Sequence, residues 1–310
     1  MTKVDAWIDA MRLRTLPLSV SGIIAGSGMA ALLEKWDPLI FALAVLTTIG
    51  FQVLSNLAND LGDGQKGTDN KNRVGPKRAI QSGSISISEM KTGIVICTAI
   101  SLISAALLIY VSAANLTKEL LLFYGVLAVL CIIAAITYTV GKNAYGYKGL
   151  GDVMVFIFFG LVSVLGVFSL YGLTFEWLVL FPALSIGFWS VAVLNLNNLR
   201  DHENDALSGK TTLIVKMGFQ SGKNYHAFLI LGGVASWFFT LLMFSYLTYN
   251  FFILIALLPS IALLFHLQKV FITRSPKKLD PELKKVALLT FFAAVLFAVI
   301  LNLTPYLVFN

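Results

Sequence analysis

The chain is divided into long apolar runs separated by shorter polar segments. Roughly 20 helical residues cross the hydrocarbon core of a bilayer, and the apolar runs reach that length. They lack the alternation of polar and apolar side chains that a membrane barrel requires. The pattern therefore predicts an all-α bundle of about nine transmembrane helices, with residues 1–310 forming a single membrane-embedded domain. The runs cover residues 15–33, 38–59, 89–113, 119–140, 151–171, 176–199, 226–247, 250–268 and 286–306.

The first residues follow a different pattern. Val4, Trp7, Ile8 and Met11 are spaced i, i+3, i+4, i+7 and share one face of a helix. This spacing predicts a short amphipathic helix that either lies in the membrane interface or packs against the bundle. Because acidic residues precede the first apolar run, we do not expect a cleavable signal peptide.

Composition and charge agree with a membrane protein. Charged residues make up 13% of the chain and hydrophobic residues 57%, whereas a soluble domain has roughly 25% charged residues. Every Lys and Arg except Lys35 and Lys118 falls on one side of the predicted bundle. Since basic loops stay in the cytoplasm, we expect a cytoplasmic N-terminus and an outside C-terminus. The net charge of +7 is spread over these loops, so membrane lipid is the expected partner and nucleic acid is not.

Acidic and amide side chains gather where two of the runs end. Near the end of the second run, Asn56, Asp60 and Asp63 are spaced i, i+4, i+7 and share one helix face, and Asp69 follows. The sixth run ends with a second such cluster on the same side of the membrane. It consists of Asn198, Asp201 and Asp205, spaced i, i+3, i+7. Because the arrangement is repeated, we expect the chain to consist of two weakly related halves, at about 12–140 and 150–306.

So many carboxylates at helix C-termini need a positive partner, because like charges repel and that end of a helix carries partial negative charge. Carboxylate and amide oxygens suit Mg²⁺, which shares its coordination shell with substrate phosphates. We predict that the two clusters face each other and hold Mg²⁺ on a diphosphate. The alternative is that these residues are solvated caps or turn formers. The predicted metal ligands are Asp60, Asp63, Asp201 and Asp205.

Basic residues lie beside both acidic clusters. Lys66 and Arg73 flank Asp69, while Arg200 lies within the second cluster and Lys210 follows it. Arg binds phosphate through two hydrogen bonds and Lys acts as a point charge. Each is a candidate for binding the diphosphate, although each could instead simply mark a cytoplasmic loop. Lys66 and Arg200 are the strongest candidates because they stand among the acids.

The cysteines and histidines form no recognisable metal pattern. Cys97 and Cys131 lie inside predicted spans and have no metal-binding spacing, so we interpret both as small core residues. His226 and His266 are interpreted as structural. His202, beside the second acidic cluster, is open to either a structural or a substrate-facing role.

At the two acidic clusters the sequence resembles the UbiA superfamily of intramembrane aromatic prenyltransferases, whose members carry an NDxxD-type and a DxxxD-type motif. Within that superfamily it looks most like the branch of 1,4-dihydroxy-2-naphthoate polyprenyltransferases, which act in menaquinone biosynthesis. The matching segments are 14–17, 59–69, 75–76, 81–83, 138–141, 147–152, 197–201 and 209–213, together with Arg73 and Asp205.

The resemblance implies a helical bundle around a central chamber, located in a bacterial inner (plasma) membrane. It implies Mg²⁺-dependent transfer of a polyprenyl group from polyprenyl diphosphate to 1,4-dihydroxy-2-naphthoate. CO₂ and diphosphate would be lost and demethylmenaquinol formed. The catalytic set would be Asp60, Asp63, Asp201, Asp205, Lys66 and Arg200. Substrate would contact Asn56, Asn59, Asp69, Arg73, Asn197, Asn198, Lys210 and Tyr138.

Several roles stay open at this level. Lys66, Arg73 and Arg14 are unranked candidates for contacting the acceptor's carboxylate, and Asp69 is a candidate general base. Cation–π contact suggests aromatic residues for the chamber wall, although each could equally be ordinary core packing. These aromatic candidates are Tyr138, Phe156, Phe158, Phe159 and Trp189.

Two other functions compete. A prenyltransferase of the same superfamily could use another aromatic acceptor, of the 4-hydroxybenzoate or homogentisate type. A secondary transporter would place ionisable groups near the bilayer midplane. Here the middles of all nine predicted spans lack Asp, Glu, Lys and Arg, which favours an enzyme acting at one membrane face.

Overall fold

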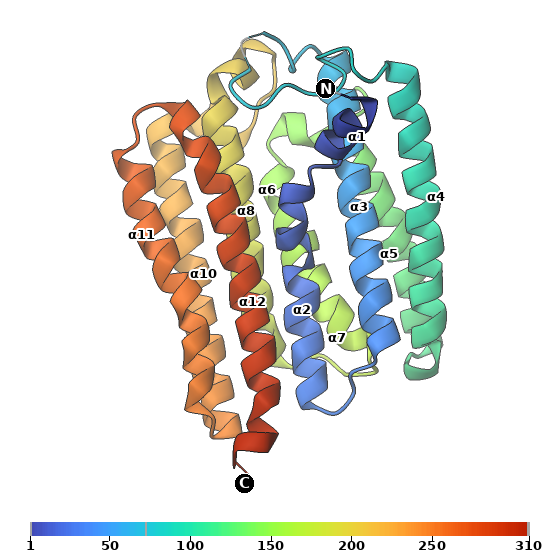
Figure 1. Ribbon diagram of the computed structural model, residues 1–310, viewed down its shortest axis with the longest axis vertical. Coiled ribbons are helices and arrows are strands. Elements are labelled where there is room, and N and C mark those ends of the chain that lie inside the picture. The colour runs from blue at the N-terminus through green and yellow to red at the C-terminus, as the bar shows by residue number, and fades with distance from the viewer. Residues whose placement is uncertain (1, 72, 309–310) are drawn as a thin grey trace.

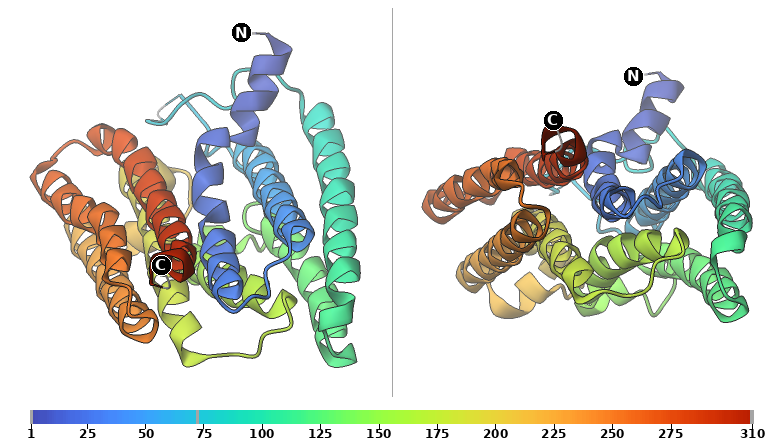
Figure 2. Two further views of the ribbon diagram at one scale, coloured as in Figure 1. Left: turned by 60° about the horizontal axis from the view of Figure 1, so that its bottom comes forward. Right: turned by 90° about the horizontal axis from the view of Figure 1, so that it is seen from below.

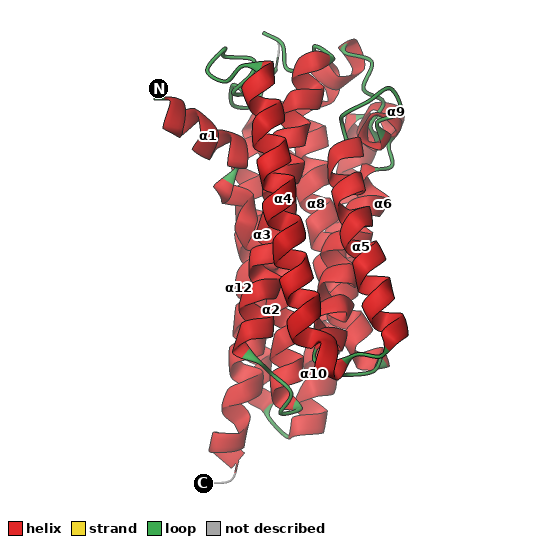
Figure 3. Cartoon of the chain, turned by 90° about the vertical axis from the view of Figure 1, so that its right-hand side faces the viewer, coloured by secondary structure: helices red, strands yellow, loops and turns green. Residues whose placement is uncertain are grey.

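The computed structural model describes residues 2–71 and 73–308, and within these ranges the chain is helical, without a β-strand (Figures 1 and 3). Nine helical segments in these ranges are long and apolar enough to cross a membrane. The predicted all-α, multi-pass bundle is therefore confirmed. The segments are Lys3–Leu32, Pro38–Gln65, Ile87–Asn115, Lys118–Thr137, Gly151–Leu170, Trp177–Leu207, Phe219–Thr248, Phe251–Ile272 and Pro276–Leu303.

Local capping residues explain where several spans begin. Asp37 precedes α3 (Pro38–Gln65), and its carboxylate accepts hydrogen bonds from two backbone N–H groups of the first turn. Before α4 (Ile87–Ser112), Ser86 and Glu89 form a reciprocal capping box. Such caps satisfy backbone donors that have no partner inside the helix. The beginnings of these two spans are therefore encoded by residues next to them in the chain.

The ends of the motif-bearing helices differ from the predicted boundaries. We expected the second and sixth spans to end at residues 59 and 199, where the apolar runs end. Instead α3 continues to Gln65 and α8 (Trp177–Leu207) continues to Leu207. Both acidic clusters therefore lie within helices. Most of the Asp and Asn side chains in these last turns are buried, so loss of hydrophobicity does not end the helix. The buried ones are Asp60, Asp63, Asp201, Asn204 and Asp205.

The fifth span is not a uniform α-helix. It consists of α6 (Gly151–Val155), a π-helical segment called η4 (Phe156–Gly166), and α7 (Val167–Leu170). Gly160 of this span approaches α8 so closely that an added Cβ would lie 2.7 Å from the Cα of Gly187. The wider π-helical turns and this close approach shape the chamber wall described below. π-helical segments are rare, and they are frequently found at functional sites.

Seen from below, the helices form a ring (Figure 2). The ring is made by α2 (Leu16–Leu32), α3, α4, α5 (Lys118–Thr137), the segment from α6 to α7, α8 and α12 (Asp280–Val308). Outside the ring, α10 (Phe219–Thr248) and α11 (Leu258–Ile272) pack against α8 and α12. The N- and C-terminal ends lie at opposite ends of the bundle, and both motif helices end on the N-terminal side (Figure 1).

The N-terminal helix α1 (Lys3–Met11) combines features of both predicted alternatives. Ala6 and Ala10 are buried against the bundle. Val4 and Ile8 of the same helix are 67% and 45% exposed. One face of α1 therefore packs on the protein, while its neighbouring apolar face is available to a membrane interface.

A buried polar chain joins the helices on the far side of α8. The Nδ1 atom of His226 lies 3.1 Å from Asn195 Oδ1, and its Nε2 atom lies 2.9 Å from His266 Nε2. His266 Nδ1 contacts the carboxylate of Glu282. Side chains of α8, α10, α11 and α12 are thus connected in one line. Since neither histidine is among the described residues lining the cavity, this arrangement supports their structural interpretation.

Candidate active site

A cavity of about 360 Å³ lies inside the ring of helices. Most of its charged lining comes from the last turns of α3 and α8 and from the loops that follow them, and Arg12 adds a charge from the N-terminal segment. Its apolar lining comes from α2, α3, α4, α5, the α6–α7 segment and α8. One chamber therefore offers a charged region and a hydrocarbon-like region. The charged and amide side chains include Asn56, Asn59, Asp63, Asp69, Arg73, Asn197, Asp201, Asn204, Asp205 and Lys210, and the apolar ones include Leu18, Ile23, Leu108, Leu127, Phe158, Phe159, Val162 and Leu170.

The two acidic clusters meet across this cavity. Lys210 connects them, because its Nζ atom lies 3.4 Å from Asp63 Oδ2 and 3.9 Å from Asp205 Oδ1. The amide of Asn204 also donates a 2.8 Å hydrogen bond to the backbone carbonyl of Thr68, in the loop after α3. Residues far apart in the chain thus contribute to one site.

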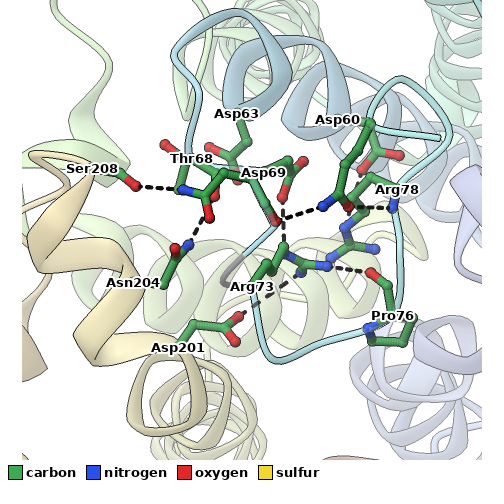
Figure 4. Close-up of polar contacts among 12 residues, drawn as sticks. Asp60, Asp63, Thr68, Asp69, Arg73, Pro76, Arg78, Asp201, Asn204 and Ser208 are labelled. Atoms are coloured by element: carbon green, nitrogen blue, oxygen red, sulfur yellow. Dashed lines mark hydrogen bonds and ion pairs between the residues drawn. The ribbon is translucent and has the colours of Figure 1, made fainter. Parts of the chain in front are cut away.

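The loop after α3 supplies a second connection (Figure 4). Arg73 Nε lies 2.8 Å from Asp69 Oδ1, and Arg73 Nη2 lies 3.9 Å from Asp201 Oδ2. Burial raises the pKa of Asp69 above its ordinary value, although the charge of Arg73 opposes this effect. Arg73 therefore holds the loop against the second cluster while lining the cavity.

Several carboxylate and amide oxygens here lack a hydrogen-bond partner. Asp69 Oδ2, Asp205 Oδ2 and Asn204 Oδ1 are buried and make no hydrogen bond to the described residues. Unpartnered buried oxygens of this kind are what a hard cation such as Mg²⁺ binds. Within residues 2–71 and 73–308, no three His, Cys, Asp or Glu side chains already converge on one point. The donor chemistry fits Mg²⁺, but Lys210 and Arg73 currently stand between the carboxylates.

Asp60 lies apart from the other acids. It is buried, and its Oδ1 atom lies 2.6 Å from Arg12 Nη2 and 3.6 Å from Arg78 Nε. It is not among the described side chains that line the cavity, whereas both arginines are. Its Oδ2 atom has no hydrogen-bond partner in the described part of the chain.

Arg200 is fully buried behind the second cluster. Its Nε atom donates to Asp201 Oδ1 at 2.9 Å, and Nη2 donates to Asn197 Oδ1 at 2.8 Å. The same guanidinium group contacts Asp280 at the start of α12. Arg200 does not belong to the described cavity lining. It positions Asp201 and Asn197 instead of presenting its own charge to the cavity.

Two lysines lie beside the ring of Tyr147. Lys66 Nζ lies 3.9 Å from the ring centroid and donates a 2.7 Å hydrogen bond to the backbone carbonyl of Thr139. Lys210 Nζ lies 5.3 Å from the same centroid. Burial would lower the pKa of Lys210, but the nearby carboxylates of Asp63 and Asp205 outweigh it and raise that pKa. Lys210 thus stays a cation at the cavity surface.

The tyrosine hydroxyls here are held in their neutral form. Tyr147 donates a 2.7 Å hydrogen bond to Asp63 Oδ1, which orients that carboxylate. Burial and the Asp63 charge raise the pKa of Tyr147. Burial raises the pKa of Tyr138, which lines the cavity, to about 12. Both groups are therefore hydrogen-bond donors and not bases at neutral pH.

The remaining candidates divide between the cavity and the core. Asn56, Asn59, Asn197, Tyr138, Phe158 and Phe159 line the cavity, and so does Cys131. Four others are not among its described lining residues, because they pack elsewhere. Asn198 is buried, Phe156 packs on Phe188, Trp189 donates to the Ile230 carbonyl, and Lys66 contacts Thr139.

Four side chains near the site were not selected from the sequence. Arg12 and Arg78 were counted only as cytoplasmic charges, and Tyr147 only as part of a matching segment. Asn204 could have been found, because it is three residues after Asp201 and therefore shares its helix face. Arg12 and Arg78 carry no such signal, since their roles depend on distant partners.

Comparison with known proteins agrees with this geometry. The model of the UbiA prenyltransferase family matches residues 19–296. The 1,4-dihydroxy-2-naphthoate octaprenyltransferase of Haemophilus influenzae is 38% identical over 298 residues, covering 96% of this chain and 95% of that protein. The Escherichia coli protein of the same name is 42% identical over 236 residues, covering 76% of this chain and 75% of that protein.

Solved structures of low sequence identity share the fold. A UbiA homolog from Archaeoglobus fulgidus bound to DMAPP and Mg²⁺ is similar with a TM-score of 0.63 and 16% identity, covering 95% of this chain and 99% of that chain. An apo UbiA homolog from Aeropyrum pernix is similar with a TM-score of 0.64 and 14% identity, covering 96% and 98% of the two chains. With its matching family model and these relatives, the chain belongs to the UbiA prenyltransferase family.

Proposed function

We propose that the protein transfers a polyprenyl group from polyprenyl diphosphate to 1,4-dihydroxy-2-naphthoate, releasing CO₂ and diphosphate and forming demethylmenaquinol. The observation that carries this proposal is that both acidic clusters meet at one end of a cavity whose wall is largely apolar. The names of the Haemophilus and Escherichia relatives support the choice of acceptor. The site also suits a donor with a charged head and a hydrocarbon tail.

Mg²⁺ is the proposed cofactor. Asp63, Asp201 and Asp205 line the cavity and would hold it, and Asp69 offers a further buried oxygen without a partner. Asp60, the fourth ligand predicted from the sequence, would contribute only through its Oδ2 atom, because its Oδ1 atom is paired with Arg12 and Arg78. When bound, Mg²⁺ supplies positive charge that stabilises the diphosphate as it leaves. Support for a divalent ion comes from the Archaeoglobus homolog, whose structures are described as bound to Mg²⁺ with DMAPP or with GPP.

Basic side chains of the protein would bind the diphosphate oxygens. Lys210 and Arg73 line the cavity between the clusters, where they can donate charge-assisted hydrogen bonds to phosphate oxygens. Arg200, held by Asp280, keeps Asp201 and Asn197 in place. Electrostatic stabilisation by groups positioned in advance lowers the barrier because little reorganisation is needed during reaction.

The apolar wall protects the reacting carbon. As the bond between C1 of the prenyl group and the diphosphate oxygen breaks, its electron pair leaves with the diphosphate. Phe158, Phe159 and Tyr138 line the cavity and can stabilise the resulting allylic cation through their ring faces. The surrounding aliphatic residues exclude water that would otherwise capture the cation.

Loss of CO₂ removes the need for a strong general base. The ring carbon that carries the carboxylate forms the new bond to C1 with a ring electron pair. The bond between this carbon and the carboxylate then breaks, and its electron pair restores the aromatic ring as neutral CO₂ departs. No proton has to leave the ring carbon.

The same proposal places the protein in its membrane. The spans would cross a bacterial inner (plasma) membrane, with the N-terminus in the cytoplasm and the C-terminus outside. The acidic clusters then face the cytosol, where a soluble naphthoate can enter, and the prenyl tail lies among the spans. Residues 1–310 would act as one domain, with halves 12–140 and 150–306 each supplying one motif helix.

An assay with purified protein in lipid vesicles tests the function. We expect demethylmenaquinol and CO₂ from 1,4-dihydroxy-2-naphthoate, polyprenyl diphosphate and Mg²⁺, and no product after EDTA treatment. Asp63→Ala and Asp205→Ala should each lower turnover by at least about a hundredfold while the protein still inserts in the membrane. Product from 4-hydroxybenzoate alone would contradict the assigned acceptor, and unchanged turnover in both variants would contradict the assigned metal site.

A further inference from the structure

The acceptor's carboxylate needs a cationic partner. The candidates from the sequence were Arg14, Lys66 and Arg73, and the structure favours other residues. Arg14 is exposed and Lys66 binds the Thr139 carbonyl, and neither is among the described residues that line the cavity. Arg73 lines the cavity, but its guanidinium group is engaged by Asp69 and Asp201. The three residues considered from the sequence are therefore poor partners for a further carboxylate.

Arg12 and Arg78 form a different kind of site. Both line the cavity, and their side chains are only 13% and 10% exposed. They converge on a single carboxylate oxygen, Asp60 Oδ1, at 2.6 Å and 3.6 Å. Arg12 Nε is buried and has no hydrogen-bond partner within the described chain. Two guanidinium groups thus share one carboxylate, which leaves one uncompensated positive charge and at least one unused donor.

Positive charge is crowded at this corner. The guanidinium groups of Arg12 and Arg78 both approach Asp60 Oδ1, so they also lie near each other. Because like charges repel, a bound anion would relieve this repulsion, whereas a neutral ligand would leave it unchanged. The electrostatics of this corner therefore favour an anionic ligand.

Arg12 lies at the turn that ends α1. Its backbone occupies the left-handed region with φ of 51° and ψ of 52°, a conformation that commonly ends helices. The turn leads into the short helix Leu13–Thr15, and the Arg12 side chain lines the cavity.

Neutral polar groups complete this corner. Thr15, Gln52 and Asn56 also line the cavity. Gln52 Nε2 lies 3.4 Å from Thr15 Oγ1 and 3.3 Å from Asn56 Oδ1, which are weak contacts that a ligand can replace. The corner thus combines a charge excess with hydrogen-bonding groups suited to ring hydroxyls. It differs from the acidic region around Asp63 and Asp205, which attracts cations.

We propose that Arg12 and Arg78 bind the carboxylate of the aromatic acceptor and thereby determine its selection, an inference that rests on the proposed function. The ring then lies between this corner and the region where the diphosphate is held. In the reaction the bound carboxylate leaves as neutral CO₂, and its bonding electron pair stays with the ring. The product therefore lacks the group that the arginines recognise, so product binds more weakly than substrate.

Steady-state kinetics and direct binding test the two arginines. Arg78→Gln removes the cation, Arg78→Lys restores charge, and Lys77→Gln is the matched control because Lys77 is the exposed neighbour. Loss of a charge-assisted hydrogen bond should raise the acceptor KM about tenfold or more in Arg78→Gln. The KM for polyprenyl diphosphate should stay within about twofold of the wild-type value. Arg78→Lys should recover part of the loss, and Lys77→Gln should behave as wild type.

Binding without donor separates this proposal from the reaction itself. Titration calorimetry should show that wild-type protein binds 1,4-dihydroxy-2-naphthoate more tightly than its methyl ester, and that Arg12→Gln and Arg78→Gln lose this preference. If the variants instead raise the KM for polyprenyl diphosphate, the arginines serve the donor and the proposal is wrong. If wild-type protein transfers no prenyl group to the naphthoate, the proposed function is wrong. The binding comparison between the acid and its methyl ester would still show whether the two arginines recognise the carboxylate.

Discussion

Lys210 stands where two buried carboxylates would otherwise repel each other, so its removal should make the protein depend on a metal ion for stability. Lys210→Gln deletes a charge 3.4 Å from Asp63 and 3.9 Å from Asp205. With an effective dielectric constant of about 20, each attraction is about 4–5 kcal/mol before desolvation is subtracted. Breaking a buried ion pair by removing one partner costs roughly 3–5 kcal/mol in measured cases.

This loss should be visible in thermal unfolding. For a chain of 310 residues, about 1 kcal/mol shifts the midpoint by roughly 2 °C, so Lys210→Gln should melt roughly 6–10 °C lower in metal-free buffer. Mg²⁺ should then raise the variant's midpoint more than that of the wild type, because the cation replaces the missing ammonium group between the carboxylates. The measurement is the apparent melting midpoint in detergent, with and without Mg²⁺.

Lys71→Gln is the control, because Lys71 is exposed and is not among the described cavity-lining residues. It should melt as wild type at both metal concentrations. The reasoning would be refuted if Lys210→Gln melted at the wild-type temperature without metal. It would also be refuted if Mg²⁺ shifted the variant and the wild type equally, since the carboxylates would then not share one cation-binding region.

Three further substitutions test other parts of the structure. Gly75→Val should lower turnover about tenfold or more without unfolding the protein, because even a Cβ there would lie 3.0 Å from Arg200 Nη2 and 3.2 Å from Arg73 Nη1. His266→Phe leaves buried polar partners unsatisfied, so we expect a loss of about 2–4 kcal/mol in unfolding experiments and a wild-type KM for both substrates. Ala128→Phe narrows the apolar part of the cavity, so competition assays should show a shift of preference toward shorter prenyl diphosphates; an unchanged preference would place the tail elsewhere.

The membrane architecture could be predicted from the sequence because a bilayer imposes a local rule. A span must bury about 20 apolar residues and close its backbone hydrogen bonds within the helix. Neighbouring residues such as Asp37 and Ser86 then mark where helices begin. The location of both acidic clusters at the same end of the bundle follows from counting spans between them. These features need only short stretches of chain.

Helix ends were less predictable, because their stability depends on tertiary contacts. The polar turns at the ends of α3 and α8 continue past residues 59 and 199 because their aspartates are buried against other segments. The π-helical segment Phe156–Gly166 also has no signature in an apolar run. The end of an apolar run shows where a helix can leave the membrane. The backbone hydrogen bonds of the helix can continue beyond that residue.

Within the site, the sequence determined which residue types were present, and the tertiary structure decided which of them face the cavity. Asp60 and Asp63 are neighbours on one helix, yet Asp63 lines the cavity while Asp60 is turned toward Arg12 and Arg78. Arg200 was expected among the catalytic groups and lies behind them, bound to Asp201 and to Asp280. The reason is physical: a buried charge takes the orientation in which its desolvation is best compensated, and its partners are supplied by segments distant in the chain.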